Sequence, residues 1–354
     1  MELRVGIIGC GRMGALRSTR LQGVLPPGWL PVSHIESVIE SPLTTVAAVA
    51  DISQESLNYV QQEYDIEFAY TEYSNLLNKN IDILTCATRT PTKATILTTA
   101  IKAGVKGIYV EKPLCNSLRE CKKILTEAEE NNVLLSYGVN RRFHSTYLKA
   151  KEVVQSKKLG NLIEIRADFG FAPLMWTHPH TFDLLNFFGG QPSSLQAELK
   201  VDSNNVKMEE QLVDADPKIV SVEIEYENGV IGKISKCGGN LVTLMLEDGV
   251  VIIHGDGLNL QIMQRSDSSS EYYTDQAFYN PMCTRGATVN AIDDLANSIN
   301  ENKGLKYITN VDIYNNMLLI MGSVWSQVNG SKKIQLKNVP EELFLTGRSG
   351  EYFA

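Results

Sequence analysis

The sequence has no long hydrophobic run: nowhere does it approach the roughly eighteen consecutive apolar residues that suggest a membrane-spanning helix. It also lacks an excess of basic residues, because 33 Lys and Arg stand against 41 Asp and Glu. The resulting net charge of -8 argues against a surface for nucleic acid or for a membrane. The first residues lead directly into a charged strand start, so we expect no signal peptide and a cytoplasmic location.

Cysteine is scarce, and its arrangement lacks the spacing of a metal site. No Cys-x-x-Cys pair occurs, and no cysteine stands at zinc-site spacing from a histidine. We therefore predict reduced cysteines in the core or in turns, without a structural metal. The six cysteines are Cys10, Cys86, Cys115, Cys121, Cys237 and Cys283.

The length and composition indicate two globular domains. A chain of 354 residues is too long for one small core, and 43% hydrophobic with 21% charged residues is ordinary for a folded protein. The pattern of apolar residues changes after Asn140. We predict a first domain over residues 1–140 and a second over residues 141–354.

A glycine-rich turn follows the first apolar run. Val5 to Ile8 is strand-like, and Gly9, Gly11 and Gly14 come next, with Arg12 and Met13 between the last two and a helix-compatible segment to Gln22. In a dinucleotide-binding unit such glycines permit the turn, the approach of a pyrophosphate and close helix packing. The pattern is weak when taken alone, because glycine turns also serve purely structural roles.

The first 138 residues alternate short apolar strands with helices, which predicts a doubly wound parallel sheet covered on both faces. Ser117 and Glu120 form a capping-box pattern before one of these helices. The expected strands are 5–8, 46–50, 83–87, 107–110 and 133–137, and the expected helices are 14–22, 53–64, 73–78, 93–103 and 118–130.

A segment rich in proline and glycine, residues 23–32, delays the second strand. Asp51, which ends that strand, falls 42 positions after Gly9, whereas roughly 20 to 30 is usual. We interpret the extra residues as a surface insertion, which either covers an adenine pocket or has no role there. Asp51 itself is expected to accept hydrogen bonds from a ribose diol and to repel a 2′-phosphate, which favours NAD over NADP; the alternative is a helix N-cap, for which Ser53 competes.

The second part of the chain alternates with period two. Asn228-Gly229 and Asp248-Gly249 separate pairs of these runs and predict hairpins. We expect an α+β domain with a large, open, mostly antiparallel sheet, an exposed loop over 266–275 and closing helices near 287–299 and 311–328. The expected strands are 163–169, 195–201, 220–226, 230–235, 241–246, 250–254 and 258–262, and a further helix is expected over 146–155.

Glu111, Lys112 and Pro113 follow an apolar strand, where side chains face the ligand crevice of a parallel sheet. With this segment the sequence resembles the Gfo/Idh/MocA family, the group of glucose-fructose oxidoreductase and inositol dehydrogenase. The resemblance runs in the family's order over nearly the whole chain. Its pieces are 9–14, 48–51, 73–77, 81–84, 103–104, 111–113, 142–143, 159–160, 180–185 and 189–190.

The resemblance implies a Rossmann domain that binds NAD and a second domain that binds substrate and often forms the oligomer interface. It implies that Lys112 and His180 are catalytic, handling the proton of a hydroxyl group. Thr88 and Glu111 are expected at the cofactor together with the glycine turn and Asp51. Arg142 and Asp183 are expected at the substrate.

The chain departs from the family's pattern at two places. Trp176 stands where an Asp precedes the catalytic His by four residues, so we expect Trp176 to stack on a sugar ring and His178 to supply the lost polar group. Arg89 and Lys93 stand in a loop and helix start that often carry Asn and His. They suit a phosphorylated or nucleotide-linked substrate, or they are solvated loop charges.

These observations predict an NAD-dependent oxidoreductase that transfers a hydride between nicotinamide and a secondary alcohol or ketone of a sugar, cyclitol or nucleotide sugar. Two alternatives stay open: a catalytically silent NAD(P)-sensing regulator of the same fold, and a reductase of C=N or conjugated bonds. We expect a homodimer or homotetramer by analogy with the family and no metal ion.

Overall fold

The computed structural model describes residues 2–266, 271–280 and 285–347, which form two compact units. Residues up to Phe143 and residues 285–313 make the first unit, and the remaining described residues make the second. The sequence placed 285–313 in the second domain, so this part of the predicted division is corrected. The roles predicted for the two domains stay predictions.

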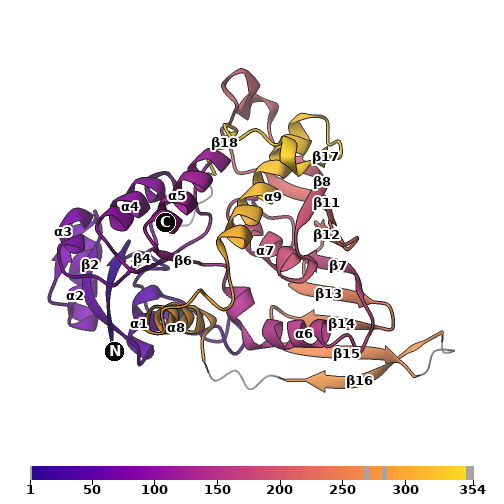
Figure 1. Ribbon diagram of the computed structural model, residues 1–354, viewed down its shortest axis with the longest axis horizontal. Coiled ribbons are helices and arrows are strands. Elements are labelled where there is room, and N and C mark those ends of the chain that lie inside the picture. The colour runs from indigo at the N-terminus through magenta and orange to yellow at the C-terminus, as the bar shows by residue number, and fades with distance from the viewer. Residues whose placement is uncertain (1, 267–270, 281–284, 348–354) are drawn as a thin grey trace. The chain divides into compact units, whose positions relative to one another are not determined.

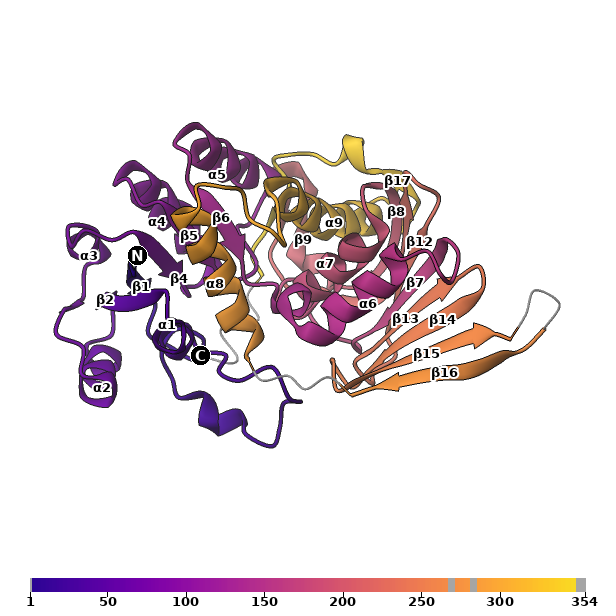
Figure 2. The ribbon, with the colours of Figure 1, turned by 60° about the horizontal axis from the view of Figure 1, so that its bottom comes forward.

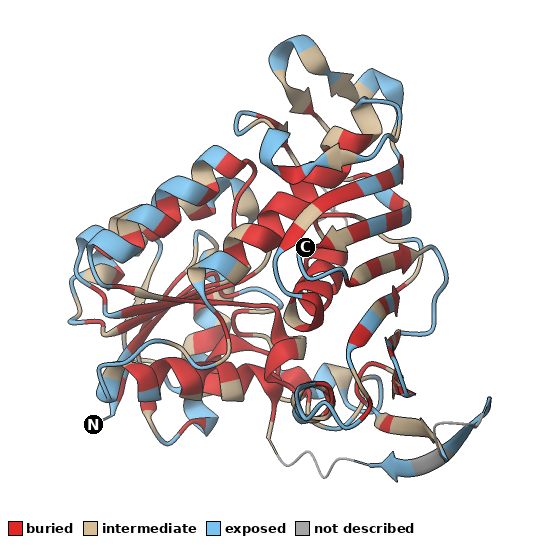
Figure 3. Ribbon diagram, turned by 45° about the vertical axis from the view of Figure 1, so that its right-hand side comes forward, coloured by how far each residue is buried: buried red, intermediate tan, exposed pale blue. Residues whose placement is uncertain are grey.

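The first unit is built on a six-stranded sheet in the order β3-β2-β1-β4-β5-β6, with every pair parallel. The order reverses between β1 and β4, as in a doubly wound fold. All residues of β4 and β5 are buried, as expected for strands covered on both faces (Figure 3). The strands are β1 (Leu3–Ile8), β2 (Thr44–Ala50), β3 (Ala69–Tyr70), β4 (Ile83–Cys86), β5 (Gly107–Val110) and β6 (Leu134–Tyr137).

Helices cover both faces of this sheet, with α1 and α8 together on one face and α4 and α5 on the other (Figure 1). Ser117 caps α5 by accepting a hydrogen bond from the Glu120 N–H, as the capping-box pattern predicted, whereas the Glu120 carboxylate accepts from the Asn116 N–H. The helices are η1 (Ser18–Leu21), α1 (His34–Glu40), α2 (Gln54–Tyr64), α3 (Tyr73–Leu77), α4 (Thr90–Lys102), α5 (Leu118–Glu130), η2 (Asn140–Phe143) and α8 (Ala287–Asn300).

The helix predicted over residues 14–22 is wrong, because the first helix of the unit is divided. After the glycine turn a single helical turn forms, with the Ala15 N–H bonded to the Gly11 carbonyl. The chain then leaves the line of this helical turn and returns to it at the start of α1. There the N–H groups of His34 and Ile35 donate to the carbonyls of Met13 and Gly14 at 2.8 and 2.9 Å. Residues 17–33 are therefore an excursion inserted into one helix, and without them Asp51 would follow Gly9 at about the usual spacing.

Helix α8 packs against β5, β6 and α1 in the first unit. A Cβ atom on Gly107, at the start of β5, would lie 2.7 Å from Leu295 of α8, so this glycine permits the close approach. The excursion also contacts the start of this helix, where the Ala287 N–H donates to the Gly28 carbonyl at 2.9 Å. Sequence order alone gave no sign that the chain returns to the first unit.

The second unit holds a nine-stranded sheet in the order β16-β15-β14-β13-β7-β12-β11-β8-β17. Its neighbours are antiparallel except β7 and β12, so the prediction of a mostly antiparallel sheet is confirmed. Its strands are β7 (Leu162–Asp168), β8 (Pro192–Lys200), β11 (Lys218–Tyr226), β12 (Ile231–Ser235), β13 (Leu241–Leu246), β14 (Gly249–His254), β15 (Asn259–Arg265), β16 (Tyr273–Tyr279) and β17 (Ile334–Gln335).

Helices α6, α7 and α9 lie on one face of this sheet, and the other face is open (Figures 1 and 2). Both predicted hairpins are confirmed, since Asn228-Gly229 connects β11 to β12 and Asp248 precedes β14 at the turn from β13. A three-stranded sheet, β18-β10-β9, completes the unit. The remaining elements are α6 (Ser145–Gln155), α7 (His178–Gly189), α9 (Asn310–Val328), η3 (Ser203–Asn205), β9 (Val206–Lys207), η4 (Met208–Glu210), β10 (Leu212–Val213), η5 (Leu336–Asn338) and β18 (Phe344–Leu345).

Several smaller predictions can be compared with the structure. Tyr273 to Tyr279 forms β16, so the loop predicted over 266–275 is partly wrong, and residues 267–270 lie outside the described part. Cys10, Cys86, Cys115 and Cys121 are buried free cysteines and Cys237 is exposed, while Cys283 lies outside the described residues. Over the described ranges, no helix has both the length and the apolar character needed to cross a membrane.

Candidate active site

The glycine turn after β1 meets the three requirements of a dinucleotide-binding turn. Gly9 has φ +92°, and a Cβ atom there would lie 2.8 Å from the Ala87 backbone. A Cβ atom on Gly14 would lie 1.7 Å from the Gly9 carbonyl oxygen, so only glycine fits. On Gly11 it would meet no described atom within 4 Å, which leaves the backbone open to a pyrophosphate. Arg12 is exposed and Met13 half-buried in the helical turn that follows.

Asp51 ties the end of β2 to this turn. Its Oδ2 accepts the Cys10 N–H at 2.6 Å, and its Oδ1 accepts the Ser53 N–H at 2.8 Å. Ser53, and not Asp51, caps α2, because its hydroxyl oxygen accepts the Ser56 N–H. Burial, and then the neighbouring Asp51 charge, raise the pKa of Cys10 to about 12, so this thiol stays protonated at neutral pH.

A cleft of about 580 Å³ opens at the carboxyl ends of β1, β2 and β4. Its wall is mainly apolar with a few polar groups, which suits an adenosine moiety. No residue of the 23–32 segment lines it, so the alternative that this segment covers an adenine pocket has no support here. The lining residues include Gly9, Gly11, Asp51, Ile52, Thr71, Tyr73, Thr88, Arg89, Pro91, Thr92 and Ile96.

Thr88 and Arg89 lie between β4 and α4, in the wall of this cleft. The Thr88 hydroxyl is 3.4 Å from the Cys86 sulfur, and the exposed Arg89 is the N-cap residue of α4. Arg89 lines this cleft and is exposed, so the two roles predicted for it, a contact to a phosphorylated substrate and a solvated loop charge, both stay predictions. Thr88 lies where the sequence expected a cofactor contact.

Lys93 lies on the buried side of α4 and is 1% exposed. Its ammonium group donates to the Glu111 carbonyl at 2.5 Å and to the Pro113 carbonyl at 2.7 Å. Burial lowers the pKa of Lys93 to about 8. Neither predicted role, a contact to a substrate phosphate or a solvated loop charge, is correct, because Lys93 holds the backbone around Lys112.

Lys112 lies two residues after the end of β5, is half-buried, and precedes a cis bond to Pro113. The neighbouring Glu111 carboxyl group is buried, and its Oε1 lies 3.3 Å from His34 Nε2. Burial would raise the pKa of Glu111, but the His34 hydrogen bond and the charges of His34, Lys112 and Lys93 lower it overall. The predicted cofactor contact from the Glu111 side chain is thus disfavoured, since that side chain is packed inside the unit.

Arg142 is 1% exposed and is anchored within the first unit. Its Nη1 donates to the Tyr307 carbonyl at 2.7 Å and lies 3.4 Å from an Asp312 carboxylate oxygen. These contacts hold η2 to the segment after α8. The substrate contact predicted for Arg142 is disfavoured by this burial, because the guanidinium packs within the first unit.

In the second unit the predicted substrate residues gather at the start of α7. Trp176 and His180 are half-buried, whereas His178 and Asp183 are 0% and 1% exposed. His178 Nδ1 lies 3.2 Å from the Thr181 hydroxyl, so the substrate contact expected of His178 is disfavoured by its burial.

Two neighbours hold α7 in place. Asn316 of α9 donates to the Pro179 carbonyl at 2.7 Å, and the Tyr226 hydroxyl of β11 lies 3.1 Å from Asn186 Oδ1. Burial and then the Asp183 charge raise the pKa of Tyr226. Asp183 is thus surrounded by helix and sheet, which disfavours the direct substrate contact predicted for it. Within the described part of the chain, no three His, Cys, Asp or Glu side chains gather as a metal site would require.

Two residues near Lys112 were missed as site residues by sequence reasoning. His34 follows the excursion and carries no motif, and only the register of α1 brings it to Glu111. Lys93 was noticed as a charge, but its burial could not be read from a helix start in which it stands between Thr92 and Ala94.

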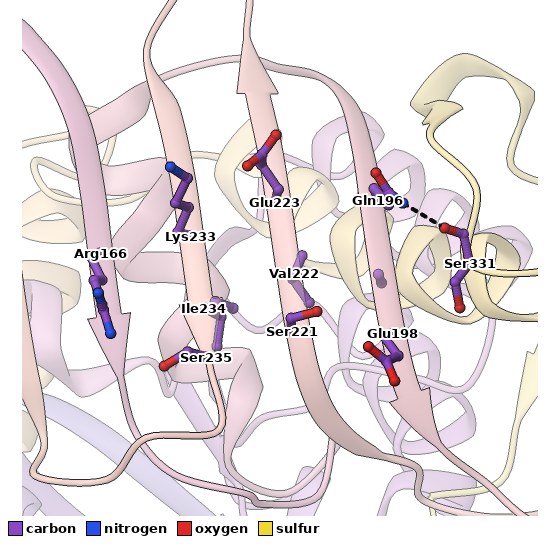
Figure 4. A pocket seen from close by; sticks show the side chains of 11 residues that line it. Arg166, Gln196, Glu198, Ser221, Val222, Glu223, Lys233, Ile234, Ser235 and Ser331 are labelled. Carbon is purple, nitrogen blue, oxygen red and sulfur yellow. Dashed lines mark hydrogen bonds between the residues drawn. The ribbon is translucent and has the colours of Figure 1, made fainter.

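A second hollow, of about 430 Å³, lies on the open face of the large sheet (Figure 4). Charged side chains from neighbouring strands line it, and several are paired: Lys233 lies 2.6 Å from Glu164, and Arg166 lies 3.0 Å from Asp168. Figure 4 shows Lys233, Glu223 and Arg166 on adjacent strands, with Gln196 bonded to the Ser331 carbonyl at 2.8 Å. Paired charges of both signs suit a polar surface contact better than a small ligand.

Comparison with known proteins agrees with this geometry. Residues 3–139 match a family model described as an oxidoreductase family with an NAD-binding Rossmann fold, GFO_IDH_MocA. A myo-inositol 2-dehydrogenase of Thermotoga maritima is 24% identical over 66% of this chain and 67% of its own length. An inositol 2-dehydrogenase of Salmonella typhimurium is 27% identical over 45% of this chain, and the match spans only 44% of that relative. The solved structure of a levoglucosan dehydrogenase with NADH and levoglucosan, 17% identical, covers 95% of this chain and 100% of its own with a TM-score of 0.76, which shows a shared fold.

Proposed function

We propose that the chain is an NAD-dependent dehydrogenase or reductase, because residues 3–139 match the model of the GFO_IDH_MocA oxidoreductase family with its NAD-binding Rossmann fold. The proposed substrate is a secondary alcohol or ketone of a sugar or cyclitol, free or nucleotide-linked. The inositol and levoglucosan dehydrogenases among its relatives support this class. Inositol and levoglucosan are both ring compounds that carry secondary hydroxyl groups.

The observation that carries the proposal is the cleft at the carboxyl ends of β1, β2 and β4, with the open Gly11 backbone and the Asp51 carboxylate at its wall. Asp51 offers acceptor oxygens to a ribose diol, and its charge disfavours a 2′-phosphate. The groups present therefore fit NAD better than NADP. NAD, when bound, supplies the hydride acceptor.

Lys112 is the proposed hydroxyl-binding group of the first unit. A half-buried amine can donate a hydrogen bond to a hydroxyl group and stabilise a developing alkoxide. His180, half-buried at the start of α7, is proposed as the group that accepts or returns the hydroxyl proton, because a histidine titrates near neutral pH. Trp176 is proposed to contact the face of the substrate ring.

Turnover assays test this function. The wild-type protein is incubated with NAD and a panel of inositols, hexoses and anhydrosugars, and growth of the reduced-nicotinamide absorbance is followed. We expect Lys112→Met to lower kcat by at least about a hundredfold. The matched control is Lys102→Met, an exposed residue in the last turn of α4, which keeps wild-type turnover.

The alternatives predict different results in the same assay. NAD binding by calorimetry without turnover of any polyol or ketone would indicate a sensor. Reduction of cyclic imines by NADH, with no activity on polyols, would indicate a C=N reductase. Either outcome would overturn the proposed substrate class and leave the NAD-binding cleft in place.

We also infer that the open face of the large sheet mediates self-association, as the family resemblance implies. Charges of both signs stand on it beside exposed apolar groups such as Met245 of β13 and Phe278 of β16. A two-fold pairing lets Lys233 meet a carboxylate of a second copy. Light scattering of Lys233→Glu should show monomers where the wild type is a dimer or tetramer, with Lys102→Glu as the control.

A further inference from the structure

We propose that Lys93 is a positioning residue for Lys112: its ammonium group holds the backbone on both sides of Lys112. The inference rests on the proposed function, in which Lys112 binds the reacting hydroxyl. It adds a residue from a different element, the first turn of α4, to the machinery of the reaction.

The geometry of the hydrogen bonds supports the positioning role. Lys93 Nζ donates to the carbonyls of Glu111 and Pro113, at 2.5 and 2.7 Å, which are the residues immediately before and after Lys112. Two fixed points one residue away on each side restrict the rotation of the backbone at Lys112. Because a small misplacement of a reacting group lowers the rate strongly, such a restriction bears directly on turnover.

Burial indicates that the amine of Lys93 has no contact with substrate. The side chain is 1% exposed, so its three N–H groups can serve only the surrounding protein. A neutral donor would satisfy the same two carbonyls at a lower cost of burial. The charge is therefore the feature that a purely structural role does not require.

Four charged or titratable groups act on Lys93, and they come from β4 and from the segment that follows β5. Cys86 lies at the end of β4, and Glu111, Lys112 and Cys115 lie in and after the loop that follows β5. Burial lowers the pKa of Lys93, and the charge of Lys112 lowers it further, against opposing contributions from the other three. The repulsion between the two amines is mutual, so Lys93 favours the neutral form of Lys112, which can accept a proton.

Glu111 connects this pair to α1. Its carboxylate Oε1 lies 3.3 Å from His34 Nε2, and the His34 ring is also in an edge contact with Tyr109 at 4.9 Å between ring centroids.

Two substitutions at Lys93 separate the effect of its hydrogen bonds from the effect of its positive charge. Lys93→Gln keeps a side-chain amide that can donate to both carbonyls but carries no charge, whereas Lys93→Met removes donor and charge together. We expect Lys93→Met to lower kcat by about ten- to a hundredfold with the KM for NAD unchanged within about threefold. Lys93→Gln should retain kcat within about threefold of the wild type at its own pH optimum. Lys102→Met, exposed on the same helix, is the control.

The second readout needs neither cofactor nor turnover. Competitive acetylation with acetic anhydride, followed by mass spectrometry, gives the reactivity of the Lys112 amine as a function of pH. Loss of the Lys93 charge should move the Lys112 acetylation profile to higher pH in both variants. For Lys93→Gln the rise of kcat/KM with pH, in the direction of alcohol oxidation, should move to higher pH by a similar amount.

The possible outcomes lead to distinct conclusions. A wild-type kcat in Lys93→Met, or an unchanged Lys112 acetylation profile in both variants, overturns the proposal. Equal losses of kcat and of NAD affinity would assign Lys93 a structural role only and also overturn it. If Lys93→Met does not fold, the Lys112 acetylation profile of Lys93→Gln alone decides whether the proposal holds. Absence of turnover in the wild type would remove the proposed function, and an altered acetylation profile would still show that Lys93 controls Lys112.

Discussion

The Asp51 carboxylate accepts the Cys10 N–H at 2.6 Å, and this bond joins the end of β2 to the glycine turn after β1. The acid proposed to recognise the ribose therefore also holds the turn proposed to receive the pyrophosphate. A change at Asp51 should affect both parts of the cleft.

We predict that Asp51→Asn lowers NAD affinity by about tenfold or more and narrows the preference for NAD over NADP. The amide cannot accept from both the Cys10 and Ser53 N–H groups, and it no longer repels a 2′-phosphate. Calorimetric titration with each dinucleotide measures both effects. Asp65→Asn, at an exposed residue that ends α2 with φ 53°, should bind like the wild type. An unchanged NAD to NADP ratio in Asp51→Asn would contradict the ribose role.

The parts of the fold that follow from local pattern were predictable. The strands at β1, β2, β4, β5 and β6 are short apolar runs, and the Asn228-Gly229 turn carries its own conformational preference. The path of the excursion was not predictable, because it depends on hydrogen bonds between residues far apart in sequence, such as His34 and Met13.

The candidate site was predictable where it depends on the conformation of the backbone. Gly9 and Gly14 stand where the backbone leaves no room for a side chain, Gly11 faces open space, and Asp51 follows the end of β2. Long polar side chains were the main source of error. Arg142 and Lys93 are both buried, and a sequence does not reveal whether a long charged side chain reaches water or a backbone carbonyl.

The divided first helix predicts the outcome of a deletion. Removing residues 17–33 lets His34 follow Leu16 in helical register, because His34 already bonds to the Met13 carbonyl four positions earlier in the shortened chain. We expect a folded protein with NAD affinity within about threefold of the wild type, since residues 17–33 do not line the cleft. Thermal unfolding and calorimetry measure this.

A deletion of residues 17–32 is the matched control. It shifts the helix by one residue and turns His34 by about 100° around the helix axis, away from Glu111. This variant should unfold at a clearly lower temperature than the variant lacking 17–33. Equal stability of the two deletions would show that the two pieces do not act as one helix.

Arg142→Met should destabilise the first unit by about 2–3 kcal/mol, because it removes a buried charged donor from the Tyr307 carbonyl. Urea unfolding measures the change, and Arg119→Met, at an exposed position of α5, should differ little from the wild type. If Arg142 instead bound substrate, as the sequence suggested, the variant would keep its stability and show a higher KM. A loss of stability with unchanged KM supports the packing role.

The burial of Lys93 leads to a prediction of how the free energy of unfolding depends on pH. Burial lowers the pKa of Lys93 from 10.5 to about 8, so between these values the unfolded chain binds more protons than the folded one. Stability from this group therefore rises with pH across that window and is constant below it. The free energy of unfolding of the wild type, measured against Lys93→Gln by urea titration, should increase by a few kcal/mol at most between pH 8 and 10.5. The difference in unfolding free energy between the wild type and Lys102→Gln, an exposed site, should show no such rise. If the difference between the wild type and Lys93→Gln is also constant with pH, the Lys93 amine keeps its ordinary pKa in the folded protein.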